Sequence, residues 1–233
     1  MEVRLNGRVY TCLEQLREQA DEELFLFLEE WFDDRSYVLG HTSGSTGAPK
    51  EIQLSKADMR ASARMTNAFF AIDRESVLLL CLSVSYIAGK MMVVRALEAG
   101  AELLTVKVSS HPLRITGQEE YVDRRIDLAA MVPMQVEESM KSESEKQRFG
   151  YIRHLIIGGA PVSVALEERL KKIPTQCYAT YGMTETVSHI ALKKLNSDPA
   201  YFALGEVGFE QDERGCLIIN APHLQAVSYT HLR

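Results

Sequence analysis

The chain has 233 residues, of which 46% are hydrophobic and 25% charged, and its formal net charge is −6. This composition is ordinary for a globular protein and excludes a chain that is disordered throughout. The acidic balance argues against a nucleic-acid surface, which usually carries a basic excess. No run approaches the roughly 18 apolar residues that span a bilayer, and no apolar signal segment is visible. Four scattered cysteines predict free thiols, so we expect a cytoplasmic protein.

The first elements are predicted to be a hairpin and one or two helices. Apolar and polar residues alternate over residues 3–10 around an Asn-Gly pair, which is a strong turn signal. Thr11 and Glu14 have the spacing of a capping box. Residues 13–28 carry apolar side chains at helical spacing, as one helix or as two that meet near Asp21.

Strands and helices then alternate along the chain. The expected strands cover residues 37–40, 77–82, 101–108, 128–132, 151–157 and 177–181, with short glycine-bounded strands up to Asn220. The expected helices cover residues 55–71, 88–98, 119–126 and 164–171, the first with Ser55 and Asp58 at N-cap spacing. The charged run 141–148 is a solvated helix face or a loop. This alternation predicts an α/β fold, with mainly parallel sheets flanked by helices and ligands at the carboxyl ends of the strands.

The most informative motif is the loop Thr42-Ser43-Gly44-Ser45-Thr46-Gly47-Ala48-Pro49-Lys50. Its glycines let the backbone approach a ligand, and its hydroxyl and N–H groups can surround phosphate oxygens. Lys50 adds a positive charge suited to a polyphosphate. The spacing differs from a Walker A loop, in which Gly-Lys precedes Ser or Thr. Taken alone, the motif is also compatible with an ordinary Ser/Gly loop.

A second motif, Tyr181-Gly182-Met183-Thr184-Glu185, follows a predicted strand. The ring of Tyr181 can stack on a nucleobase, and the hydroxyl of Thr184 can donate to a phosphate. The carboxylate of Glu185 is a hard oxygen ligand that suits Mg²⁺. The alternative is a buried tyrosine beside a surface glutamate.

A third motif, Gly158-Gly159-Ala160-Pro161, follows the apolar strand that ends at Ile157. Small residues at the carboxyl end of a strand leave a flat shelf that admits a planar ring. Taken alone, this segment also fits an ordinary turn between a strand and a helix.

Together and in this order, the three motifs resemble the AMP-forming acyl-CoA synthetases of the adenylate-forming superfamily. The resemblance runs from about Val38 to Leu224, and it departs from the family pattern at Glu51, where the family usually has glycine. It implies that residues 42–47 and Lys50 bind ATP phosphates, that the segments at 158–161 and 181–184 bind the adenine and the α-phosphate, and that Glu185 holds Mg²⁺. It also implies Lys50, Thr184 and Glu185 as catalytic residues and coenzyme A as co-substrate.

The wording of the motifs is most similar to the o-succinylbenzoyl-CoA synthetases of menaquinone biosynthesis. The resemblance implies an acyl pocket near five residues, namely Tyr86, Gly89, Lys90, Arg95 and His189. An arginine can bind the second carboxylate of such a substrate in a bidentate manner. Arg95 is equally compatible with a helix surface, and His189 with a structural role. A synthetase for another aryl or fatty acid, and a nucleotide-binding module without turnover, are the alternative functions.

The resemblance also predicts what the chain lacks. Residues 1–226 are expected to form a partial adenylation domain, and residues 227–233 do not resemble the continuation of the family. The family's ribose-binding Asp and its C-terminal domain with a catalytic Lys have no counterpart, so we expect this chain alone to bind ATP weakly and to make little acyl-CoA. We expect small-molecule partners only, a carboxylate, ATP and CoA, without nucleic acid or a membrane span, and homo-oligomerisation is left open.

Overall fold

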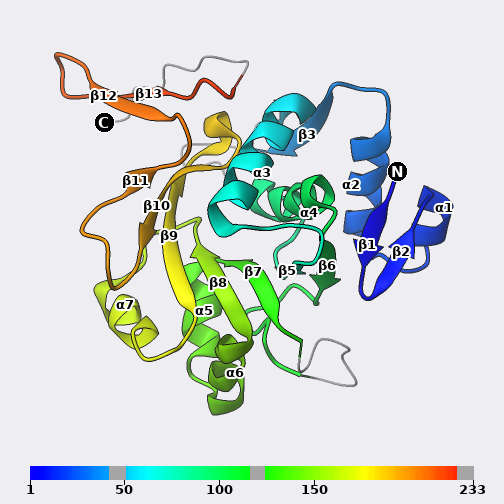
Figure 1. Cartoon of the computed structure of the whole chain (residues 1–233), viewed down its shortest axis with the longest axis horizontal. Coiled ribbons are helices and arrows are strands. Elements are labelled where there is room, and N and C mark those ends of the chain that lie inside the picture. The colour runs from blue at the N-terminus through cyan, green and yellow to red at the C-terminus, as the bar shows by residue number, and fades with distance from the viewer. Residues whose placement is uncertain (42–50, 116–123, 225–233) are drawn as a thin grey trace.

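The computed structural model describes residues 1–41, 51–115 and 124–224 (Figure 1). The elements of its first half are β1 (Val3–Leu5), β2 (Arg8–Tyr10), α1 (Leu13–Leu16), α2 (Glu22–Phe32), β3 (Tyr37–His41), β4 (Glu51–Ser55), α3 (Lys56–Phe70), β5 (Val77–Leu80), α4 (Ile87–Ala99) and β6 (Glu102–Thr105). Those of its second half are β7 (Ile126–Met131), α5 (Pro133–Ser139), α6 (Glu143–Arg148), β8 (Ile152–Ile157), α7 (Val164–Leu170), β9 (Gln176–Gly182), β10 (His189–Lys194), β11 (Phe202–Ala203), β12 (Gly208–Gln211) and β13 (Leu217–Asn220), with 3₁₀ turns at Phe149–Tyr151 and Thr184–Thr186.

A nine-stranded sheet runs through the described part of the chain in the order β11-β10-β9-β8-β7-β5-β6-β1-β2. Neighbouring strands from β9 to β1 are parallel. The outer strands β2, β10 and β11 pair in antiparallel fashion. The predicted α/β fold with a mainly parallel sheet is therefore confirmed.

Helices cover both faces of this sheet (Figure 1). Leu78 and Leu80 of β5 point into a core shared with α2, α3 and α4. Leu79 and Cys81 point to the opposite face, into a core that includes Val136 of α5 and Leu166 of α7. A parallel strand that is buried on both faces is apolar without alternation, which explains the uninterrupted hydrophobic runs in this sequence.

The sheet reverses its order between β5 and β7. The chain leaves β5 through α4 and returns as β6 on one side of β5, whereas β7 pairs with the other side. The helices that follow β5 and β7 consequently lie on opposite faces of the sheet. Such a switch point opens a crevice at the carboxyl ends of the two strands, and ligands bind there in α/β proteins.

Several predicted elements need correction. The helix expected over 119–126 is wrong at its end, because Ile126 begins β7, an apolar strand buried between β5 and β8; residues 119–123 lie outside the described part. The capping box at Thr11 is also wrong, since α1 begins after Cys12 without a side-chain cap. Helix α5 was not predicted, because the sequence analysis used Pro133 only to end the preceding strand. In the structure Pro133 is the first residue of α5, a position that proline favours.

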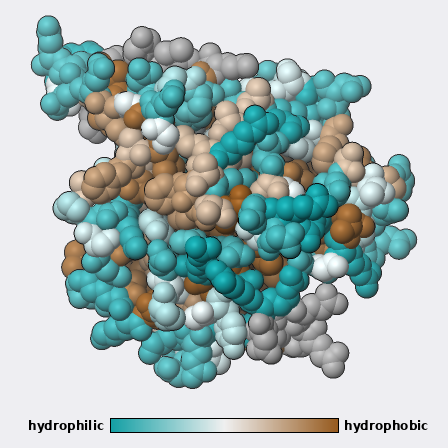
Figure 2. Space-filling model, viewed as in Figure 1, coloured by the Kyte–Doolittle hydropathy of each residue, from teal (hydrophilic) through white to brown (hydrophobic). Residues whose placement is uncertain are grey.

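The face drawn in Figure 2 shows hydrophobic surface gathered beside the β9–β11 side of the sheet. Phe69, Tyr201 and Phe202 are among the large apolar side chains that are exposed, and Phe69 packs edge-on against Tyr178 of β9. The edge strand β11 has only two residues. A very short edge strand is one way in which proteins limit pairing with other chains.

Candidate active site

A cavity of about 360 Å³ lies at the switch point, at the carboxyl ends of β5, β7, β8 and β9. Its wall consists of Leu82, Ser83, Tyr86, Ile87, Ala88, Arg95, Ala130, Met131, Val132, Ile156, Gly158, Gly159, Thr180, Gly182, Met183, Thr184, Val187, Ser188 and His189. A second cavity of about 300 Å³ lies between the N-terminal hairpin, α2 and α4, away from the motif residues. Only the first cavity combines a switch point with residues of two motifs, so it is the candidate site.

Two of the three motifs contribute to the cavity wall, Gly158 and Gly159 after β8 and Gly182, Met183 and Thr184 after β9. At Gly182 a Cβ atom would lie 2.4 Å from the carbonyl oxygen of Ser188, so another residue would push the two segments apart. The segments at 158–159 and 182–184 both line this cavity. The phosphate motif, residues 42–50, lies outside the described part.

Other motif residues lie beside the wall rather than in it. Ala160, Pro161, Tyr181 and Glu185 are not among the lining residues. The ring of Tyr181 packs against Tyr201 and Phe209, with ring centroids 6.1 and 6.2 Å apart. Its stacking on adenine and the role of Glu185 stay predictions.

The turn that closes the cavity after Thr184 contains a strained residue. Val187 has φ 63° and ψ −45°, although it is β-branched and buried. A positive φ is unfavourable for such a residue and persists only where the surroundings impose it. Here it turns the chain so that Ser188 and His189 reach the wall.

Arg95 of α4 is the charged residue of the cavity wall. Only 2% of its surface is exposed, and burial lowers the pKa of its guanidinium to about 9. Its Nη2 atom donates to the hydroxyl of Ser188 over 2.7 Å, whereas its Nε atom is buried without a hydrogen-bond partner among the described residues. In the described part of the chain no carboxylate forms an ion pair with it, so the site offers a desolvated cation to a ligand.

His189 stands between Arg95 and Thr66 of α3. Its Nδ1 atom lies 3.5 Å from Nη2 of Arg95, and its Nε2 atom lies 3.0 Å from the hydroxyl of Thr66. Because that hydroxyl donates to the carbonyl of Ser62, Thr66 accepts a hydrogen bond from Nε2. Burial first, and then the charge of Arg95, hold the pKa of His189 well below its usual range. We therefore assign a neutral imidazole whose Nδ1 lone pair faces the guanidinium.

The remaining predicted substrate residues divide into two groups. Tyr86 lines the cavity and is 62% exposed, so it stands at the mouth. Gly89 lies on the inner side of α4, where a Cβ atom would be 2.2 Å from the carbonyl oxygen of Ser83. Lys90 is buried outside the cavity, above the ring of Phe27 and 4.0 Å from Glu30. The structure brings Tyr86, Arg95 and His189 together, but it does not place Gly89 and Lys90 on the wall.

Comparison with protein families decides the affiliation, because the model of the AMP-binding enzymes matches residues 9–227. This chain belongs to the AMP-binding enzyme family. The 2-succinylbenzoate–CoA ligase of Oceanobacillus iheyensis is 25% identical over 198 residues, which are 81% of this chain and 40% of the ligase. The chain thus spans about 40% of the length of this curated relative.

Solved structures carry the same fold. An AMP-forming acyl-CoA synthetase/AMP-acid ligase II-like protein of Dyadobacter fermentans is 35% identical, with a TM-score of 0.79 over 89% of this chain and 59% of that protein. The o-succinylbenzoate coenzyme A synthetase of Bacillus subtilis, in complex with ATP and magnesium ion, is 20% identical, with a TM-score of 0.64 over 80% of this chain and 41% of that protein.

The described residues could hold a magnesium ion only together with the phosphate groups of a bound substrate. In the described ranges no three His, Cys, Asp or Glu side chains come together as a metal site. Glu185 is exposed beside the cavity and could supply one oxygen ligand. Mg²⁺ is commonly held by one or two carboxylates, substrate phosphates and water, so a single glutamate is compatible with it.

Sequence reasoning missed Thr66, Val187 and Ser188. The motif pattern ends before Val187, and Thr66 lies inside a helix far away in the chain. No local signal marks Thr66, because its contact with His189 depends on how α3 packs against β10.

None of the helices in the described ranges combines the length and the hydrophobicity that a membrane-spanning helix requires.

Proposed function

We propose that this chain contributes the nucleotide and acid sites of an AMP-forming acid–CoA ligase. The observation that carries the proposal is the cavity at the switch point, where residues of two of the motifs stand beside a buried arginine that has no carboxylate partner among the described residues. Membership of the AMP-binding enzymes supports the nucleotide half of the proposal. The acid half depends on Arg95 and on the apolar wall.

In the proposed reaction, a carboxylate oxygen of the acid attacks the α-phosphorus of ATP. The bond to the bridging oxygen breaks and pyrophosphate leaves, so that the acid becomes a mixed anhydride with AMP. The thiol sulfur of CoA then attacks the acyl carbon; AMP leaves, the thiol loses its proton and a thioester forms. The chemistry requires positioned reactants and neutralised phosphate charge more than it requires a protein nucleophile.

The residues have distinct proposed roles in that reaction. Lys50 neutralises charge on the β- and γ-phosphates, and the hydroxyl of Thr184 donates to the α-phosphate. Glu185 is the carboxylate for Mg²⁺, which supplies charge neutralisation on the phosphates when bound. Gly158 and Gly159 leave room for the adenine beside the chain.

We propose o-succinylbenzoate as the acid, since the curated relative described above carries that name and since Arg95 suits a second carboxylate. Apolar lining by Leu82, Ile87, Met131 and Ile156 suits the ring of such a molecule. The same apolar lining favours a second candidate, a synthetase for another aryl or fatty acid. A nucleotide-binding chain without turnover is the third.

Single-turnover release of pyrophosphate tests the proposal, because it detects adenylation even when CoA transfer is slow. The full chain, in excess over ATP and with ample Mg²⁺, is mixed with o-succinylbenzoate, benzoate or a medium-chain fatty acid. We expect pyrophosphate release that depends on the acid and is fastest with o-succinylbenzoate. Faster release with a monocarboxylate would favour the second candidate, and ATP binding without release would favour the third.

A further inference from the structure

His189 stands at an irregular start of strand β10. It follows the turn that contains Val187, and the pairing of β10 with β9 shifts its register between His189 and Ala191. Such an irregularity re-aims a side chain, so the direction of the ring depends on the groups that it contacts. These groups come from two helices, Arg95 of α4 and Thr66 of α3.

The two contacts agree on which nitrogen of the His189 ring carries the proton. A guanidinium has only donors, so Nδ1 of His189, which lies 3.5 Å from Nη2 of Arg95, must offer its lone pair. The proton then stands on Nε2, 3.0 Å from the hydroxyl oxygen of Thr66. That oxygen can accept it, because its own hydrogen is donated to the backbone carbonyl of Ser62. Thr66 thereby selects the form of the ring that accepts from Arg95.

The ring supplies a second acceptor for one nitrogen of Arg95. Nη2 donates to the hydroxyl of Ser188 over 2.7 Å and faces Nδ1 of His189. Two acceptors for the two hydrogens of one nitrogen fix the plane of the guanidinium, whereas a single acceptor lets that plane turn. Among the described residues Nε has no partner, and Nη1 lies 3.5 Å from the sulfur of Met92, a weak acceptor. These two nitrogens are therefore left for a ligand.

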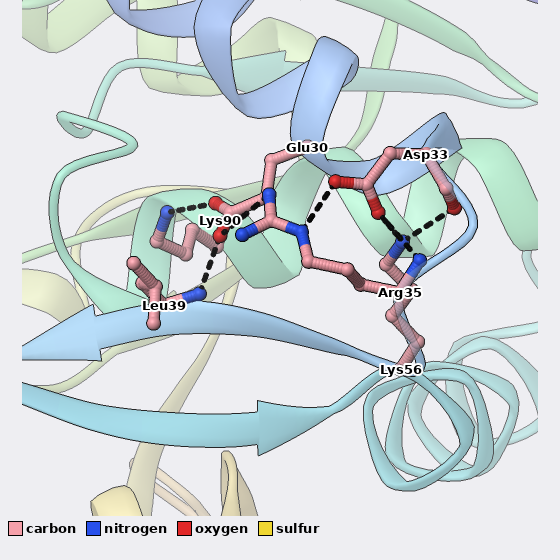
Figure 3. A network of polar contacts seen from close by, with 6 residues as sticks. All are labelled: Glu30, Asp33, Arg35, Leu39, Lys56 and Lys90. Carbon is pink, nitrogen blue, oxygen red and sulfur yellow. Dashed lines mark hydrogen bonds and ion pairs between the residues drawn. The ribbon is translucent and has the colours of Figure 1, made fainter.

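The backbone of α4 is held by groups other than Thr66. The side-chain amide of Asn67 donates to the backbone carbonyl of Arg95 over 2.9 Å. On another side of the helix, the ammonium group of Lys90 lies 4.0 Å from a carboxylate oxygen of Glu30 in α2 (Figure 3). Loss of the Thr66 hydroxyl should therefore leave α4 in place and reach the guanidinium only through the ring of His189.

We propose that Thr66 is a specificity-determining positioning residue, which holds His189, and through it the guanidinium of Arg95, in the orientation that receives the second carboxylate of the acid. The proposal rests on the function proposed above, since it names what orients the cation of that site. Thr66 is fully buried and lies outside the cavity wall, so it acts on a ligand only through the two residues in between.

Removal of the hydroxyl should change the form of the ring and the preference for the acid together. In Thr66→Val the buried Nε2 atom loses its acceptor, so protonation of Nε2 becomes less favourable. A ring that carries its proton on Nδ1 instead repels the donors of Arg95. An acid with one carboxylate should bind as before, whereas damage to the whole pocket would weaken every acid.

Nitrogen NMR of the full chain with isotope-labelled histidine tests the form of the ring without any ligand. The chain has 6 histidines, and His189→Gln identifies the signals of His189 by their disappearance. In the wild type we expect a proton on Nε2 and none on Nδ1. Thr66→Val should show the reverse or a mixture, and Thr66→Ser, which keeps the hydroxyl, should show the wild-type pattern. A wild-type ring with its proton on Nδ1 would overturn the proposal.

Calorimetric titration of the same proteins tests the preference. The two acids are o-succinylbenzoate and 3-benzoylpropionate, which lacks the ring carboxylate. For Thr66→Val we expect the ratio of the two Kd values to shrink about threefold or more, through weaker binding of o-succinylbenzoate alone, and Thr66→Ser should restore it. The matched control is Ser62→Ala, one turn earlier in α3. Its buried hydroxyl has no partner among the described residues, so neither Kd should change.

The outcomes separate this role from the proposed function. If Thr66→Val keeps the preference, weakens both acids alike or is not rescued by Thr66→Ser, the role of Thr66 is overturned and the proposed function stands. A wild type that binds both acids alike would overturn the proposed acid and this role together. Should Thr66→Val not fold, Thr66→Cys takes its place in both measurements, because a thiol is a weak acceptor of similar size.

Discussion

Arg95 combines full burial with an incomplete set of hydrogen bonds. A guanidinium that is removed from water without a carboxylate partner destabilises the fold, since the desolvation of a charge costs several kcal/mol. Ser188 and the neutral ring of His189 offset part of this cost. We infer that an anionic ligand group supplies the rest when it enters the cavity.

A second buried imidazole, that of His154, should make the stability of the protein depend on pH. Burial first, and then the charge of Arg153, lower its pKa to about 4. Its Nδ1 atom, beside the rings of Phe70 and Tyr178, has no hydrogen-bond partner in the part of the chain that the structure describes. The unfolded chain binds this proton near pH 6.5, whereas the folded protein binds it only near pH 4. The contribution of His154 to the free energy of unfolding therefore has its full value above pH 6.5 and decreases as the pH falls toward 4.

Urea unfolding at several pH values checks this dependence with His154→Phe. We expect the free energy of unfolding of the variant to fall less steeply between pH 6.5 and 4 than that of the wild type. The pKa of His189 is also lowered, so His189 contributes to the pH dependence of the free energy of unfolding in both proteins. Equal slopes would show that His154 does not titrate as its surroundings require.

At the scale of elements, local sequence signals succeeded where the interaction itself is local. The Asn6-Gly7 turn has positive φ at both residues, as a two-residue hairpin requires. Asp21 and Ser55 cap α2 and α3, and both lie where the pattern predicts a helix to begin. The pairing of β3 with β4 was not predictable, because the strand signal of residues 51–55 is weak and its partner lies beyond the phosphate motif.

The cap at Ser55 links that hairpin to helix α3. Its hydroxyl accepts a hydrogen bond over 3.2 Å from the backbone N–H of Asp58. We expect Ser55→Ala to lower the free energy of unfolding by about 1 kcal/mol, and Ser55→Asp to keep it close to the wild-type value. Urea denaturation measures both, and an unchanged midpoint for Ser55→Ala would mean that packing alone sets the start of α3.

For the whole molecule, two features of the sequence, strand–helix alternation and motifs at strand ends, predicted where the candidate site lies. The switch point between β5 and β7 brings both described motifs to one cavity. The sequence did not predict long-range contacts such as those between His189 and Thr66 and between Leu39 and Glu30, because each of them depends on tertiary packing. Lys90 shows the same limit, since helical spacing alone does not decide whether it faces the cavity or α2.

Arg95 should give the cavity a preference for an acid with a second carboxylate. Calorimetric titration compares o-succinylbenzoate with 3-benzoylpropionate, which lacks the ring carboxylate, for the wild type and for Arg95→Met. We expect the wild type to bind the dicarboxylate at least about tenfold more tightly, since a hydrogen-bonded charge pair contributes roughly 1.5–3 kcal/mol, and Arg95→Met to bind both acids alike. A wild type without this preference, or a variant that keeps it, would show that Arg95 does not bind the second carboxylate.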